Sequence, residues 1–90
     1  MPKKIDYDLP KLNETNETIG QRIAKIRKKR KISQQILADK IGIKRYLVSD
    51  YELGRARIYD EMVVRFAIAL EVSTDYLLGL TNEPEPLPKK

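Results

Sequence analysis

The chain has 90 residues, of which 41% are hydrophobic, so it can bury one small core but not two. It contains no cysteine and no histidine, which excludes a disulfide framework, a thiolate zinc site and catalysis by the commonest general base. No stretch approaches the roughly 18 consecutive apolar residues of a membrane span, and the first residues lack the apolar core of a signal peptide. We therefore expect one soluble, cytoplasmic domain with no enzymatic activity and no cofactor.

The formal net charge is +5, and it is distributed unevenly along the chain. Residues 19–57 carry twelve Lys and Arg against three Asp and Glu, a net of +9, whereas residues 1–18 sum to −1 and residues 58–90 to −3. Such a concentration of cations is typical of a surface that binds a polyanion, because neutralising phosphates releases condensed counterions. The alternative is a solvated, lysine-rich helix face, and the charge run alone does not decide between the two.

Residues 1–17 contain two prolines and mixed charges without helical periodicity, so we expect a flexible arm there. A helix is predicted over residues 19–30, because Thr18 and Gln21 have the spacing of a capping box and isoleucines recur at positions 19, 23 and 26. The rest of its circumference is expected to expose basic side chains, namely Arg22, Lys25, Lys29 and Arg30.

Two short helices with a turn of about three residues between them are predicted next. Ser33 is a good N-cap for a helix over residues 34–40, and Gly42 ends that helix. A helix over residues 45–53 begins almost at once and stops at Gly54. This arrangement predicts a helix-turn-helix unit.

The second half of the chain predicts two further helices. Residues 60–70 place apolar side chains at the i, i+1, i+4, i+5, i+8 positions of a buried helical face. A short fifth helix should begin after Ser73 and end at Gly79. Residues 81–90 contain three prolines, and we expect a disordered tail there. The expected fold is therefore all-α, with five helices in a domain of residues 18–80.

Three residues fit the close packing of the two helices in the predicted unit. Ala38 allows the helices to cross closely, Gly42 permits a positive φ in the turn, and Val48 fills the interface. The stretches IGQRIAKIRKKRKISQQILADKIGI, KRYLVSDYELG and VVRFAIALEVSTDYLLG extend this match over residues 19–79. In this order they resemble the lambda/434 repressor and Cro-type helix-turn-helix family, also called the xenobiotic-response-element (XRE) family. The resemblance implies a lambda-repressor-like fold and a transcription regulator, here taken as a repressor, that binds operator DNA as a dimer.

The resemblance places the DNA-reading surface on the helix of residues 44–53, because the corresponding helix of the family enters the major groove. Base contacts are expected from exposed residues of its first two turns, namely Lys44, Arg45, Tyr46, Ser49 and Asp50. Arg45 is the first candidate, since a planar guanidinium can bond O6 and N7 of guanine together. A solvated surface arginine is the alternative for this position.

The same resemblance assigns roles to positions outside the reading helix. Phosphate contacts are expected from Gln34, Arg55 and Arg57. Arg27 and Glu52 match a structural ion pair of the family and are not expected to read DNA. The homodimer interface is expected at Tyr76, Leu78 and Leu80.

Two other functions stay open on the sequence alone. The domain can serve protein recognition, for example as the antitoxin of a toxin pair, in which case a partner protein should co-purify with it. It can also be a basic protein that binds RNA or DNA without sequence preference. That function predicts similar affinity for operator and random duplex, whereas an operator-specific regulator discriminates between them about a thousandfold or more.

Overall fold

The computed structural model describes residues 17–85 and contains five helices in that range. They are α1 (Ile19–Lys29), α2 (Gln34–Ile41), α3 (Arg45–Leu53), α4 (Asp60–Leu70) and α5 (Thr74–Leu78). The described residues include no strand, and the predicted all-α, five-helix fold is confirmed. Residues 1–16 of the expected arm and residues 86–90 of the expected tail lie outside the described range. No helix within that range has the length and apolar character needed to cross a membrane.

Side-chain caps explain where several helices begin. Thr18 and Gln21 form the predicted capping box: Oε1 of Gln21 accepts from the Thr18 amide at 2.8 Å, and Oγ1 of Thr18 accepts from the Gln21 amide at 3.1 Å. Ser33 and Ser73 cap α2 and α5 through their hydroxyl oxygens. Two predicted boundaries are off by one residue, since α1 ends at Lys29 and α2 continues to Ile41.

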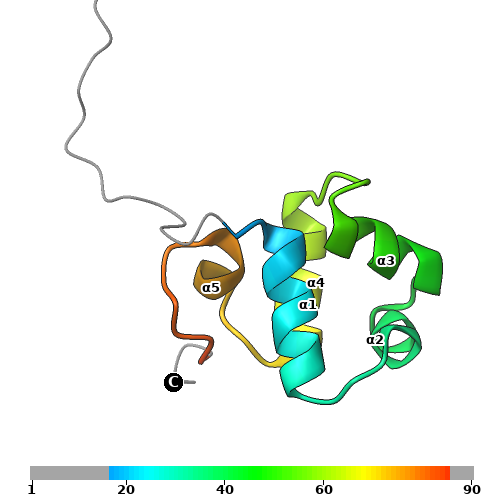
Figure 1. Ribbon diagram of the computed structural model, residues 1–90, viewed down its shortest axis with the longest axis horizontal. Helices are drawn as coiled ribbons and strands as arrows, with labels where there is room; N and C mark the ends of the chain where they lie inside the picture. Colours follow the sequence, from blue (N-terminus) through cyan, green and yellow to red (C-terminus); the bar gives the residue numbers. More distant parts are fainter. Residues whose placement is uncertain (1–16, 86–90) are drawn as a thin grey trace, which may run out of the picture.

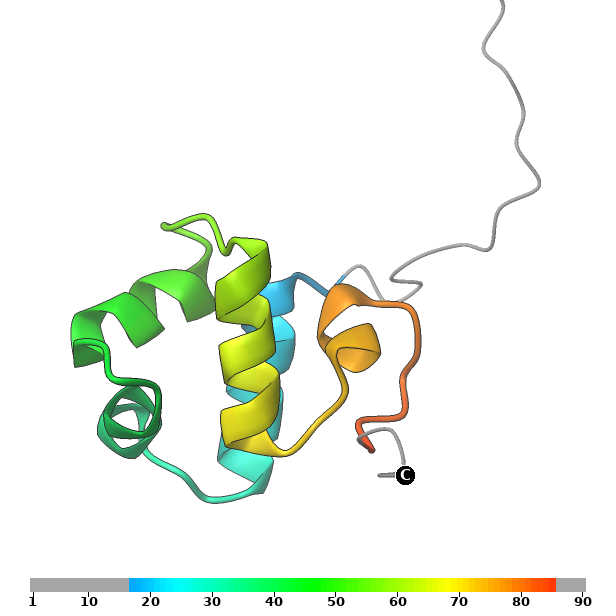
Figure 2. The same ribbon diagram turned by 180° about the vertical axis from the view of Figure 1, so that it is seen from behind.

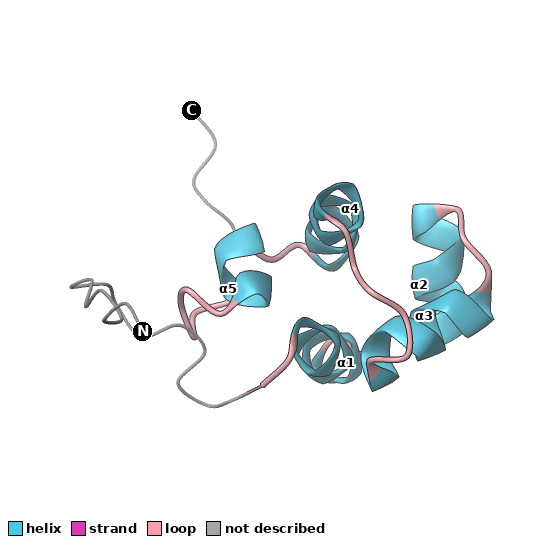
Figure 3. Cartoon of the chain, turned by 90° about the horizontal axis from the view of Figure 1, so that it is seen from above, coloured by secondary structure: helices cyan, strands magenta, loops and turns pink. Residues whose placement is uncertain are grey.

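The helices pack around one core. Seen from above in Figure 3, α1 and α4 lie side by side in the middle, with α5 on one side and α2 and α3 on the other. Figure 1 shows α1 in front of α4, and the view from behind in Figure 2 shows α4 in front. The core is built from aliphatic side chains of all five helices around Phe66, whose ring meets that of Tyr51 edge to face at 5.7 Å. Helices α2 and α3 therefore pack against α1 and α4, which hold them in place.

A glycine allows α1 and α3 to approach each other closely. Gly20 is buried in the first turn of α1, and a Cβ atom added there would collide with the carbonyl oxygen of Tyr51 and lie 2.9 Å from that of Glu52. Only a residue without a side chain leaves room for the α3 backbone at this point. Gly20 thus fixes the distance between the first helix and the C-terminal half of the third.

The prediction that Arg22 belongs to the exposed basic face is wrong. Its side chain is 1% exposed, and its guanidinium lies 4.8 Å from the centroid of the Tyr76 ring. Nη1 donates to the carbonyl oxygens of Tyr76 and Thr81 at 2.9 Å each, and Nη2 donates to Oδ1 of Asn82 at 2.8 Å. A buried charge is retained at such a place only when hydrogen bonds satisfy it, and here they come from the end of α5 and the segment after it.

The segment after α5 is tied to the domain beyond the predicted boundary at residue 80. Besides the bonds from Arg22, the carbonyl oxygen of Pro84 accepts from the Ser73 amide at 3.0 Å. Residues 81–85 are therefore part of the packed unit, although their proline content predicted the start of a disordered tail. The physical reason is that two of the acceptors, the carbonyl oxygens of Thr81 and Pro84, belong to the backbone and depend little on side-chain identity, while Asn82 adds a side-chain oxygen.

Candidate nucleic-acid interface

Helices α2 and α3 form the predicted helix-turn-helix unit. The side chains of Ala38 and Val48 are fully buried, as the close crossing of the two helices requires. Gly42 has a φ of 83°, and the amides of Gly42 and Ile43 donate to the carbonyl oxygen of Ala38 at 2.8 and 3.0 Å. The left-handed glycine thus ends α2 and redirects the chain, so that α3 starts at Arg45 only a few residues later.

The N-terminal end of α3 presents cations to solvent. Lys44 is the N-cap residue and makes no side-chain capping hydrogen bond, and Lys44, Arg45 and Tyr46 are all exposed. The first turn of α3 contains no acidic residue. Because the N-terminus of a helix carries a partial positive charge, two cations at this end raise the local potential instead of lowering it. The arrangement is suited to an anionic ligand.

Ser49 and Asp50, one turn further along α3, are half-buried and less accessible than the residues before them. The carboxylate of Asp50 forms no ion pair with Lys44 or Arg45 in the described part of the chain, which leaves both cations available. The Asp50 backbone carbonyl accepts from the amides of Arg55 and Ala56 at 2.8 and 3.3 Å. Asp50 therefore also anchors the start of the loop that follows α3.

A hydrogen-bonded chain connects the start of α3 to α1. The ion pair predicted between Arg27 and Glu52 is present, with Nε to Oε2 at 2.7 Å and Nη2 to Oε1 at 3.1 Å. Oε1 of Glu52 also accepts from Nε2 of Gln34 at 3.0 Å, and Oε1 of Gln34 accepts from Nη1 of Arg45 at 3.4 Å. The most exposed member, Arg45, is in this way linked to a buried carboxylate through one amide.

The loop after α3 supplies two more cations. Gly54 ends the helix with a φ of 75°, and the side chains of Arg55 and Arg57 beyond it are exposed. Neither arginine forms an ion pair with any residue of the described range. Together with Lys44 and Arg45 they place positive charge that forms no ion pair within residues 17–85 at both ends of α3.

The family follows from this fold together with the sequence. Residues 20–83 match the family model of the helix-turn-helix domain. The chain belongs to this family. The resemblance to lambda/434 repressor and Cro-type regulators predicted from the sequence is confirmed by this match together with the relatives and solved structures that follow, and the helix-turn-helix domain has the fold of DNA-binding transcription regulators.

A curated relative and two solved structures agree with this assignment. An uncharacterized HTH-type transcriptional regulator of Bacillus subtilis, YobD, is 38% identical over 66 residues, which are 73% of this chain and 59% of YobD. The chain thus spans less than two thirds of that relative. The P22 c2 repressor in complex with a synthetic operator has a TM-score of 0.65 at 33% identity, over 70% of this chain and 96% of that one. SinR, the master regulator for biofilm formation, in complex with DNA has a TM-score of 0.64 at 31% identity, over 68% and 98%.

Several cations of the basic run at residues 22–31 bond to other parts of the helix-turn-helix domain. Besides the buried Arg22 and the paired Arg27, Arg30 donates through Nη2 to the carbonyl oxygen of Glu71 at 3.3 Å, and Nζ of Lys25 lies 3.6 Å from Oε2 of Glu17. The lysines of the run that form no ion pair in residues 17–85 are Lys28, Lys29 and Lys31. The charge count from the sequence therefore overstates the cationic surface of this helix.

One of the residues expected at the dimer interface is not accessible. The side chain of Tyr76 is 4% exposed, because its ring covers the guanidinium of Arg22, so the expectation that it contacts a second subunit is wrong. Leu78 and Leu80 are 47% and 54% exposed. These two leucines remain available for contact with another molecule.

The structural roles of two residues of the helix-turn-helix domain, Gly20 and Gln34, are not predicted from the sequence. Sequence rules do not separate Gly20 from the other helix residues, although a glycine in the first turn of a predicted helix is a weak sign of close packing. The bonds from Gln34 to Glu52 and Arg45 join residues 18 and 11 positions apart, and no spacing rule relates them.

Among residues 17–85, no group of three His, Cys, Asp or Glu side chains lies close enough to hold a metal ion.

Proposed function

We propose that this chain is a non-enzymatic, sequence-specific repressor that binds double-stranded operator DNA in the cytoplasm and reads the major groove with α3. The observation that supports this best is the exposed, cationic start of α3, held in place by the buried ion pair of Arg27 and Glu52 through Gln34. The P22 c2 repressor, similar in fold, is known in complex with a synthetic operator. A reading helix needs this combination of a free polar face and a rigid support.

Base recognition falls to the residues at the start of α3. Arg45 can bond O6 and N7 of a guanine through two nitrogens of its guanidinium, and Lys44 can donate to the same acceptors or to a phosphate. Tyr46 is 57% exposed, and its ring can contact a thymine methyl. Ser49 and Asp50 lie deeper along the helix, where Asp50 can accept from the amino group of a cytosine.

Phosphate contacts position the domain on the duplex. Arg55 and Arg57 can reach the backbone on one side of the groove, and the N-terminal end of α2 at Gln34 can approach it on the other. The amide of Gln34 already bonds to Glu52 and Arg45, so a phosphate at α2 would be met chiefly by backbone N–H groups. These contacts supply affinity but do not select a sequence.

The protein is proposed to act as a homodimer that contacts itself through Leu78 and Leu80. Burying two half-exposed leucines on each subunit removes apolar surface from water, and a twofold axis there matches a palindromic operator. Half-sites should then be about one helical turn, roughly 34 Å, apart. A protein that sediments as a monomer both free and on a palindromic duplex would contradict this part of the proposal.

Selection from a random duplex library, followed by fluorescence anisotropy on the selected site, tests the function. The selected duplex should bind about a thousandfold or more tightly than random DNA. Arg45→Ala should lose about 1 to 3 kcal/mol of discrimination at one base position, whereas Arg57→Ala should weaken all duplexes alike and reduce the salt dependence. Equal losses on cognate and random DNA would overturn the role of Arg45, and a failure to enrich any sequence would overturn specific binding.

A further inference from the structure

A groove between α2 and α4 lies outside the proposed DNA surface. It is lined by Lys40 and Ile41 of α2 and by Arg65, Ile68 and Ala69 of α4, and it encloses a volume of about 170 Å³. None of these five residues is among those expected to contact DNA or to form the dimer. A ligand in this groove therefore does not compete directly for the residues that serve the proposed function.

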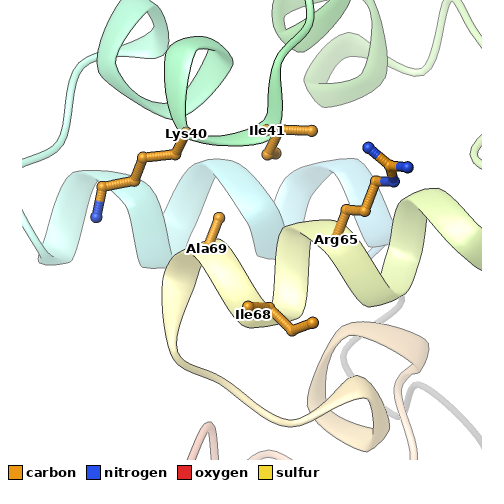
Figure 4. Close-up of a pocket in the computed structure, with 5 residues that line it drawn as sticks. All are labelled: Lys40, Ile41, Arg65, Ile68 and Ala69. Carbon is orange, nitrogen blue, oxygen red and sulfur yellow. The ribbon is translucent and has the colours of Figure 1, made fainter.

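The groove combines an apolar floor with a cation at each end. Figure 4 shows the side chains of Lys40 and Arg65 on opposite sides of Ile41 and Ala69, with Ile68 at the rim. Ile68 is 72% exposed, the highest value among the large hydrophobic side chains of the described range. Aliphatic surface that stays in contact with water next to a groove is typical of a site that another molecule covers.

The two cations are available to a partner. Lys40 forms no ion pair in residues 17–85. Arg65 donates to Oε1 of Glu61 at 2.9 Å, but the two side chains are 51% and 77% exposed. Such a surface pair one helical turn apart contributes little stability, so Arg65 can exchange Glu61 for another carboxylate at small cost.

The size of the groove decides which kind of ligand it fits. Sites for cofactors and other small molecules enclose about 300 to 1,000 Å³, and this groove is smaller and open. Its volume suits one or two aliphatic side chains that project from a larger molecule. Carboxylates on either side of those side chains would meet Lys40 and Arg65.

We propose that the α2–α4 groove is a docking site for an acidic, amphipathic helix of a partner protein, which inserts an aliphatic side chain between Ile41 and Ala69 and pairs its carboxylates with Lys40 and Arg65. This inference goes beyond the proposed function, because none of the residues that line the groove belongs to α3. The protein could then hold DNA and the partner together.

The test measures binding of a fluorescein-labelled acidic peptide to the full chain. The probe is a helix-forming peptide of about 14 residues with two leucines one turn apart and glutamates on both sides, and the matched control carries glutamine at each glutamate. We expect saturable binding in the micromolar range that weakens with salt, and binding of the glutamine peptide about tenfold weaker or more. Absence of saturable binding of the glutamate peptide at millimolar protein would overturn the proposal.

Substitutions locate the site. Lys40→Glu, Arg65→Glu and Ile68→Ser should each weaken the peptide about tenfold, whereas Lys28→Glu, an exposed charge change outside the groove, should not. A peptide with lysines in place of its glutamates should recover binding to the double variant Lys40→Glu, Arg65→Glu. Circular dichroism spectra that match that of the unaltered chain show that the variants are folded. Unchanged peptide binding by all three groove variants would overturn the proposal that the peptide binds in this groove.

The chain itself contains an acidic and apolar stretch, IDYDL at residues 5–9, which is the competing occupant. In the full chain with Asp6→Asn and Asp8→Asn, we expect the peptide affinity to stay within about twofold of the unaltered value. An increase of tenfold or more would overturn the proposal of an outside partner, because the groove would then be filled by the protein's own residues.

Discussion

The carboxylate of Glu52 accepts a hydrogen bond from the side-chain amide of Gln34 at 3.0 Å. Because the amide nitrogen must face this carboxylate, the amide oxygen is turned the other way, toward Nη1 of Arg45 at 3.4 Å. Glu52 is itself held by Arg27 of α1. The orientation of an exposed arginine at the start of α3 is thus set by a carboxylate that is buried beneath it.

Replacing Gln34 with leucine should reduce sequence discrimination more than overall affinity. The substitution removes the acceptor that restrains Arg45, and we expect selectivity at the base read by Arg45 to fall several-fold, with a stability loss of about 1 kcal/mol. Fluorescence anisotropy on the selected duplex and on duplexes changed at single base pairs measures this. Gln35→Leu, at the neighbouring exposed position, is the matched control. If Gln34→Leu weakened every duplex by the same factor, Gln34 would be a phosphate contact and not a positioning residue.

Glu52→Ala should destabilise the fold strongly. The side chains of Arg27 and Glu52 are 11% and 6% exposed, so removing the carboxylate leaves a largely buried guanidinium without its partner, at a cost of about 3 to 5 kcal/mol. Urea denaturation followed by circular dichroism gives the difference. The double variant Arg27→Met, Glu52→Leu removes both charges and should lose much less. A double variant as unstable as Glu52→Ala would show that packing, and not the unpaired charge, accounts for the loss.

The sequence predicts the features that depend on residues close together in the chain, and it does not predict those that depend on residues far apart. The capping box at Thr18, the serine caps and the left-handed Gly42 and Gly54 involve residues at most a few positions apart, and helix bounds were accordingly within one residue. Those rules cannot place Arg22, because its burial depends on Tyr76, Thr81 and Asn82, which lie 54 to 60 positions away. A helical wheel places a basic residue on the polar face unless tertiary partners are known.

The candidate site shows the same division. The exposure of Lys44, Arg45 and Tyr46 was expected from the family resemblance, since it follows from the geometry of the helix-turn-helix unit formed by α2 and α3. The burial of Tyr76 was not expected, because α5 is short and its orientation is decided by Arg22 beneath it. Contacts between side chains that meet only through the tertiary fold, such as that of Gln34 with Glu52, do not follow from the sequence.

Gly20→Ala should destabilise the protein although alanine favours helices. Helix propensity alone predicts a gain of up to about 1 kcal/mol. The added Cβ would instead collide with the carbonyl oxygen of Tyr51, and the two helices must separate, so we expect a net loss of about 2 kcal/mol or more in urea denaturation. Ala24→Gly, in the same helix, is the control and should lose about 1 kcal/mol by propensity alone. A variant Gly20→Ala that is more stable than the unaltered chain would show that α1 and α3 are not in contact here.

Lys31→Gly should stabilise the protein. Helix α1 ends in a Schellman motif: the amide of Ile32 donates to the carbonyl of Arg27 and that of Lys31 to the carbonyl of Lys28, both at 3.0 Å. Lys31 occupies the left-handed position of this motif with a φ of 58°, where a Cβ atom costs about 1 kcal/mol that glycine avoids.

The greater freedom of glycine in the unfolded chain offsets part of that gain, so we expect a net increase of about 0.5 kcal/mol in the free energy of unfolding, measured in urea. The matched control is Lys29→Gly, two residues earlier in the helical part, which should lose about 1 kcal/mol. Because the two variants remove the same charge from neighbouring exposed positions, their opposite signs isolate the backbone conformation as the cause. A loss of stability in both would mean that Lys31 contributes through its side chain and not through its backbone.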